Sequence, residues 1–160
     1  MKRTSSLLHG GIVSVLLLSS LPATAQNTLF GTGALASNTT GDNNSAFGFR
    51  SLYQNTTGIL NTANGYQSLF STTTGNYNAA NGAQSLYTNT TGSYNTANGV
   101  NALYYNTTGN NNAANGVNAL YYNTTGYNNV ANGYQSLYSS TTGNNNAANG
   151  YYSPSLISRT

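Results

Sequence analysis

The sequence has no cysteine and no tryptophan, and it is almost free of charge, with four Lys or Arg and one Asp or Glu in 160 residues. Without cysteine, the chain cannot hold a disulfide framework. Residues 26–160 retain only Arg50, Arg159 and Asp42 as charged side chains, so the net charge of this part is two minus one, or +1, against +3 for the whole sequence. So few cations cannot neutralise a run of phosphates, which argues against nucleic-acid binding and against a polybasic membrane site.

The same absences bear on catalysis. Residues 26–160 contain no His, Cys, Lys or Glu, so they offer no base to activate the many Ser and Thr hydroxyls. Asp42 is the only carboxylate side chain, which leaves no pair of catalytic carboxylates and leaves zinc and calcium without their usual ligands. We therefore expect no enzyme, no catalytic residue, no metal site and no cofactor, and we interpret Asp42 as a solvated turn residue.

Residues 1–25 have the pattern of a secretory signal peptide. Lys2 and Arg3 give a positive start, residues 12–21 form a short apolar run, and Ala23-Thr24-Ala25 fits an A-x-A cleavage site. The apolar run is shorter than a bilayer-spanning helix requires. The sequence thus predicts a secreted or cell-surface protein whose mature part begins at Gln26 and has no membrane span.

The remainder of the sequence is a repeat with a period of 17 residues, marked by two sets of glycines. The first set is Gly31, Gly48, Gly65, Gly82, Gly99, Gly116, Gly133 and Gly150, and the second is Gly41, Gly58, Gly75, Gly92, Gly109, Gly126 and Gly143. No insertion or deletion interrupts the period. Each unit must therefore be positioned by its neighbours, as in stacked-repeat proteins.

Other residue types keep the same register. Asn stands four residues before each glycine of the first set, and Leu stands four residues after each of them from Gly31 to Gly133. A Thr-Thr pair precedes each glycine of the second set. The expected structural positions are the first-set glycines from Gly48 to Gly133, together with Asn61, Asn78, Asn95, Asn112, Leu52, Leu69, Leu86, Leu103, Leu120 and Leu137. Like residues would stack into ladders if the units lie on top of one another.

The composition favours β-structure. Thr, Tyr and Phe favour strands, whereas two glycines per unit and many Asn residues disfavour helix. Asn-Gly and Thr-Gly indicate turns because Gly accepts a positive φ. The sequence predicts an all-β fold, a β-solenoid (parallel β-roll) of about seven to eight coils over residues 26–152, with two short strands per coil and a tail at 153–160 where Pro154 breaks the repeat. A β-meander with Asn-Gly hairpins is the alternative.

An aromatic residue follows Leu in six units. Adjacent residues of a strand point to opposite faces, so we expect Leu in the core and the aromatic column outside, as a binding or oligomer surface. This candidate surface consists of Tyr53, Phe70, Tyr87, Tyr104, Tyr121 and Tyr138. One Leu and a few small residues make a thin core for each coil, so we also expect a homo-oligomer.

The pattern Asn-x-Ala-x-Gly-x-x-Ala/Ser-Leu, seen from Asn95 to Leu103, resembles the head repeats of YadA-type trimeric autotransporter adhesins. Arrays of Asn-Thr-Ala-x-Gly and Asn-Thr-Thr-Gly are also similar to repeats in bacterial surface proteins and phage tail fibres. The resemblance spans residues 27–152 and implies a left-handed parallel β-roll that forms a homotrimer. It also implies a location at the bacterial outer membrane, attachment to host or matrix surfaces, and a role in virulence. The unit here is longer than the usual head repeat.

We therefore expect a non-catalytic role in adhesion to a host, matrix or neighbouring-cell surface, with a surface protein or glycan as partner. A structural extracellular matrix or amyloid-like fibre is the alternative, favoured by the low charge and the Asn and Gln content. Ice binding by the Thr columns is a third hypothesis. The sequence alone leaves all three open.

Overall fold

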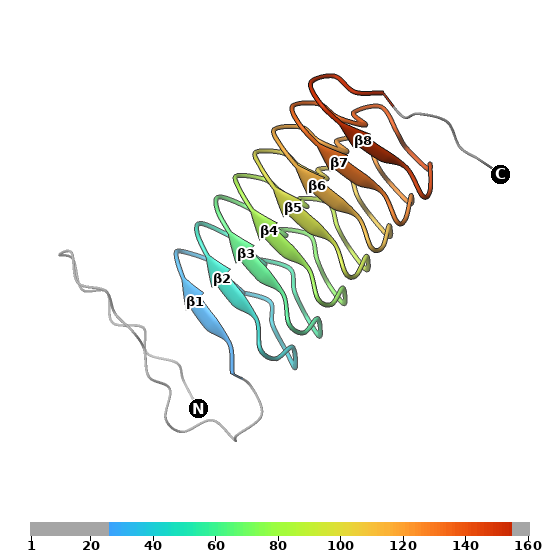
Figure 1. Cartoon of the computed structure of the whole chain (residues 1–160). Coiled ribbons are helices and arrows are strands. Elements are labelled where there is room, and N and C mark those ends of the chain that lie inside the picture. The colour runs from blue at the N-terminus through green and yellow to red at the C-terminus, as the bar shows by residue number, and fades with distance from the viewer. Residues whose placement is uncertain (1–25, 155–160) are drawn as a thin grey trace, which may run out of the picture.

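The computed structural model describes residues 26–154, which form a single stack of flattened coils (Figure 1). The strands are β1 (Thr28–Phe30), β2 (Ser45–Phe47), β3 (Thr62–Asn64), β4 (Ala79–Asn81), β5 (Thr96–Asn98), β6 (Ala113–Asn115), β7 (Val130–Asn132) and β8 (Ala147–Asn149). They lie in one sheet in sequence order, which confirms the predicted β-solenoid. The predicted signal peptide, and the tail from residue 155 onward, lie outside the described residues. Within residues 26–154 no helix is long and apolar enough to cross a membrane.

Neighbouring strands are parallel and pair in the register of the repeat. Ala80 pairs with Ala97 and Asn81 with Asn98, each 17 positions further along the chain. A meander would require antiparallel neighbours joined by hairpins, so that alternative is wrong. Each column of the sequence repeat is consequently a ladder running along the stack.

The prediction of two strands per coil is wrong, because each coil contains one strand of three residues. The segment around Leu103 is a turn, in which Leu103 has a φ of 52° and Asn101 a φ of 56°. Its backbone groups nevertheless pair with the next coil, as where the Leu103 N–H donates to the Ala119 carbonyl at 3.0 Å. Hydrogen bonds between coils thus fix this half of the coil without extended backbone.

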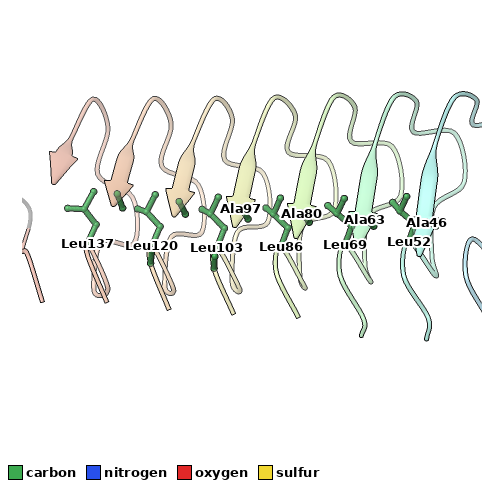
Figure 2. Packing of buried hydrophobic residues seen from close by; sticks show 14 of the residues in the cluster. Ala46, Leu52, Ala63, Leu69, Ala80, Leu86, Ala97, Leu103, Leu120 and Leu137 are labelled. Atoms are coloured by element: carbon green, nitrogen blue, oxygen red, sulfur yellow. The ribbon is translucent and has the colours of Figure 1, made fainter. Parts of the chain in front are cut away.

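Leucines and small residues fill the interior (Figure 2). The leucines from Leu52 to Leu137 are at most 1% exposed, and the alanine at the middle of each strand from β2 to β7, such as Ala97, is fully buried. A left-handed backbone costs a non-glycine residue about 1–2 kcal/mol, while burial of a Leu side chain stabilises by about 1.5–3 kcal/mol. Burial therefore holds each leucine in a conformation that its own backbone disfavours.

Buried asparagines close each coil and join it to the next. Asn95 is fully buried, donates its Nδ2 to the Gly109 carbonyl at 2.8 Å, and accepts the backbone N–H of Asn112 at 3.0 Å. A second buried ladder includes Asn106, whose Nδ2 donates to Asn89 Oδ1 at 2.8 Å. The predicted Asn ladder is confirmed, and it satisfies polar backbone groups that lie away from water.

The two sets of glycines serve different purposes. The first set has positive φ, for example 142° at Gly99, as predicted for a turn. The second set does not, and there the positive φ falls two residues later, with 56° at Asn111. A Cβ atom at Gly92 would lie 2.5 Å from the Gly109 carbonyl oxygen of the next coil. The second-set glycines are therefore required by the close approach of neighbouring coils rather than by backbone conformation.

Candidate binding surface

The aromatic column lies at the surface and is half-buried. Consecutive rings stack on one another, with centroids 5.0 Å apart for Tyr87 and Tyr104 and 5.2 Å apart for Tyr104 and Tyr121. The stacking continues without a break from Tyr53 to Tyr138. Leu and its aromatic neighbour thus separate into core and surface as expected, although they do so in a turn and not in a strand.

This stacking determines which part of each ring a partner can reach. Parallel rings of adjacent coils cover one another's faces, as for Tyr53 and Phe70, whose planes differ by 3°. The exposed parts are then the ring edges and the phenol hydroxyls. A partner would meet a ridge of apolar edges and hydrogen-bonding groups, repeated once per coil.

A second apolar column stands one residue after each first-set glycine from Gly48 to Gly150. Its members are Phe49, Tyr66, Ala83, Val100, Val117, Tyr134 and Tyr151. All except Ala83 are exposed, with Tyr66 at 51%, Val100 at 44% and Val117 at 39%. Sequence reasoning missed this column because its residue type changes from coil to coil. The available signal was its constant register together with the absence of charge.

Arg50 bridges the two columns at their N-terminal end, and the same position is Gln or Asn in the coils that follow, from Gln67 to Gln135. The Arg50 guanidinium carbon lies 5.1 Å from the centroid of the Phe49 ring and 5.3 Å from that of Tyr53. At the other end, the rings of Tyr134 and Tyr152 are 5.7 Å apart. We call the three columns together the aromatic face: residues 49, 66, 83, 100, 117, 134 and 151; residues 50, 67, 84, 101, 118, 135 and 152; and residues 53, 70, 87, 104, 121 and 138.

Three tyrosines of this face are weaker acids than usual. The pKa values of Tyr104, Tyr121 and Tyr138 are raised above 10.0, first by desolvation and then by neighbouring tyrosines. At Tyr138 a hydrogen bond with Tyr122 adds to the effect. These side chains are therefore neutral phenols at physiological pH and can donate hydrogen bonds.

The raised pKa values predict a loss of stability in alkali. Above pH 10 the unfolded chain releases these phenolic protons before the folded chain does, so the free energy of unfolding falls as the pH rises further. Urea unfolding measured from pH 7 to pH 12 should show a constant midpoint up to about pH 9 and a decline above it. A variant with Phe at 104, 121 and 138 should decline less, and Phe70 shows that Phe fits this column. An equal decline in both proteins would contradict the assignment.

The Thr-Thr pairs lie on a different part of each coil and divide into two roles. The first Thr of each pair donates its hydroxyl to the backbone of the next coil, as from Thr107 Oγ1 to the Thr124 carbonyl at 3.0 Å. The second Thr, such as Thr108, is exposed. The Thr array that faces solvent freely is thus one column wide.

Asp42 lies in a turn at the N-terminal end of the stack. It is half-exposed, and its carboxylate accepts the backbone N–H of Asn43 at 2.8 Å and that of Gln26. Residues 26–154 hold no group of three or more His, Cys, Asp or Glu side chains that would suit a metal ion. The surface features of this part of the chain are therefore aromatic, amide and hydroxyl groups.

No family model matches the sequence, and comparisons with curated proteins and with solved structures found no match.

Proposed function

We propose that this chain is a non-catalytic adhesion module that acts outside a bacterial cell and attaches to a host, matrix or neighbouring-cell surface through its aromatic face. The observation that carries the proposal is the exposed apolar column from Phe49 to Tyr151, which Arg50 bridges to the aromatic ladder at its N-terminal end. Contiguous apolar patches on a protein surface are characteristic of sites that bind a partner.

The periodic construction of the face supports a role in attachment. Its columns repeat at the spacing of stacked coils, about 4.8 Å, and coil-to-coil hydrogen bonds hold them in place. Successive coils then present equivalent weak binding sites, and the total affinity grows with the number of coils that contact the partner. Arg50 is the only cation in residues 26–154, so apolar contact and neutral hydrogen bonds would supply the binding energy.

A direct test is the retention of coated beads. Beads carrying residues 26–160 should stay on surfaces coated with collagen or with mucin under flow, whereas beads carrying a Val100→Asp/Val117→Asp variant should be released, because two charges interrupt the apolar column. The matched control is Thr91→Asp/Thr108→Asp, which places the same charges on the exposed Thr column in neighbouring coils. Equal retention of the three proteins, or none on either coating, would argue against attachment through this face.

The resemblance to adhesin head repeats leads us to propose a homotrimer as well. Burial of exposed apolar residues outside the aromatic face, such as Leu29, Phe30 and Phe47, between chains would add apolar area to a core that holds one Leu per coil. Size-exclusion chromatography with light scattering on residues 26–160 should give the mass of three chains for the wild type, the Thr variant and the Val variant, because neither variant changes those residues. A monomeric wild type would contradict the homotrimer.

The free edge of the last coil favours a second candidate function, a matrix fibre. Among residues 26–154, strand β8 pairs with β7 alone, and a Cβ atom built on Gly150 meets no atom of these residues within 4 Å. Exposed strand edges are templates for further pairing. A concentration series separates the two functions, because an adhesion module keeps a fixed mass while a fibre grows without limit and binds amyloid dyes.

A further inference from the structure

Five tyrosines of adjacent coils form a cluster that breaks the regularity of the repeat. Two of them, Tyr105 and Tyr122, follow the aromatic column at a position where other coils carry Gln54, Ser71, Thr88 or Ser139. With Tyr104, Tyr121 and Tyr138 they make the tyrosine cluster, in which two neighbouring columns are both aromatic in consecutive coils.

The rings of this cluster meet at right angles as well as in stacks. Tyr105 and Tyr121 have centroids 5.3 Å apart and planes at 89°, and Tyr122 and Tyr138 have centroids 5.2 Å apart and planes at 80°. Each of these pairs joins one coil to the next. Tyr105 is 39% exposed and Tyr122 42% exposed, so a small oxidant or an enzyme-bound one can reach them.

Tyrosine is also the only readily oxidised type of side chain in residues 26–160, which contain no Cys, Met, Trp or His. An electron removed from this part of the chain therefore comes from a tyrosine. Raised pKa values keep Tyr104, Tyr121 and Tyr138 protonated near neutral pH, so each oxidation must release a proton together with the electron.

We propose that the tyrosine cluster is an oxidative cross-linking site, at which Tyr105 couples to Tyr121 and Tyr122 couples to Tyr138. The oxidant is hydrogen peroxide acting through a haem peroxidase. Each phenol loses one electron and one proton to become a phenoxyl radical, and two radicals join through a carbon–carbon bond between ring positions ortho to the oxygens. The hydrogen on each joined carbon then moves to its oxygen and restores the phenol. Two hydrogen atoms are lost per bond, and one peroxide is reduced to two waters.

The perpendicular contacts distinguish these pairs from the stacked ones. Tyr104–Tyr105 and Tyr121–Tyr122 are also perpendicular, with centroids 4.8 Å and 4.9 Å apart, but each of these pairs lies within one coil and would not join a coil to the next. A bond between ortho carbons holds two rings edge to edge and twisted, so an edge already directed at its neighbour needs less rearrangement than a face-stacked pair. Tyr77 and Tyr94 supply the contrast: they are exposed and adjacent, but their rings are parallel, with centroids 4.9 Å apart and planes within 4°. A bond between coils would stabilise the solenoid as a disulfide does, by restricting the unfolded chain. This chain has no cysteine with which to form a disulfide.

The test compares two matched variants of residues 26–160, treated at low protein concentration with a haem peroxidase and hydrogen peroxide. The wild type should develop dityrosine fluorescence, keep the mass of one chain less two hydrogens per bond, and yield cross-linked peptides that join residues 105 to 121 and 122 to 138. Its thermal midpoint should rise after treatment. Tyr105→Phe/Tyr122→Phe should lose most of the fluorescence and all of the rise, because ring stacking survives but no phenoxyl forms at either position.

Tyr77→Phe/Tyr94→Phe removes the same number of exposed tyrosines and should behave like the wild type. Both variants retain the smaller perpendicular group of Tyr134, Tyr151 and Tyr152 at the end of the stack, so that group cannot account for a difference between them. Equal loss in the two variants, cross-links that map elsewhere, or coupling only between separate chains would overturn the proposal. None of these outcomes bears on adhesion, which the bead assay tests separately with unoxidised protein.

Discussion

Gly99→Ala should be among the most damaging single substitutions in this chain, lowering the free energy of unfolding by about 3–6 kcal/mol. Two effects add. The φ of 142° at Gly99 belongs to a region that is nearly restricted to glycine. The new Cβ atom would also lie 2.5 Å from the Gly116 carbonyl oxygen, a backbone atom that cannot rotate away. Urea unfolding followed by circular dichroism gives the change in free energy.

Gly150→Ala is the matched control, because it separates the two effects. Gly150 has a φ of 120° but no atom of another coil within 4 Å of the added Cβ atom. The cost of Gly150→Ala is then the conformational one alone, about 1–3 kcal/mol. It falls on a terminal coil, which unfolds locally more easily than a central one. If both variants lost the same stability, the contact between coils would not be what requires glycine at this column.

The second large effect is expected from Asn95→Ala, with a loss of about 2–4 kcal/mol. The substitution removes the acceptor of the buried Asn112 N–H and one of the two donors to the Gly109 carbonyl. A buried N–H without a partner costs more than an ordinary hydrogen bond contributes, because water cannot replace the lost partner. The loss should appear as a lower urea midpoint and as faster amide hydrogen exchange at Asn112.

Asn98→Ala provides the comparison within the same coil. Asn98 also belongs to an amide ladder, accepting from Asn81 Nδ2 at 2.9 Å and donating to Asn115 Oδ1 at 2.8 Å, but it is exposed. Water can satisfy the groups that its removal leaves, so we expect a loss of about 1 kcal/mol or less. A cost as large as that of Asn95→Ala would show that ladder formation, and not burial, determines the contribution of these asparagines.

The placement of the candidate sites was only partly predictable. Identical columns predicted the aromatic ladder from Tyr53 to Tyr138, since like residues must stack when coils repeat in register. The column that includes Val100 and Val117 was missed because its residue type varies, and its exposure depends on the path of the turn. The right-angle contacts of Tyr105 and Tyr122 were likewise not predictable, because they depend on side-chain packing between adjacent coils.

The sequence by itself determined the period and the residues that recur along the stack, while it left a meander open as the alternative to parallel coils. A spacing of 17 residues without interruption permits one stacking register, and within it Leu103 and Asn95 are repeated in every neighbouring coil. These features follow from the order of residues along the chain, whatever path each coil takes.

Only the tertiary structure decided the path of each coil. Propensity favoured a second strand through the Leu and Tyr positions, yet Leu103 has a left-handed backbone, because that conformation directs its side chain into the core and its N–H to the next coil. The second-set glycines were taken for turn residues, but Gly92 is required by contact with the coil above it. In both cases the deciding interaction joins residues one repeat apart, and no local pattern in the sequence records its strength.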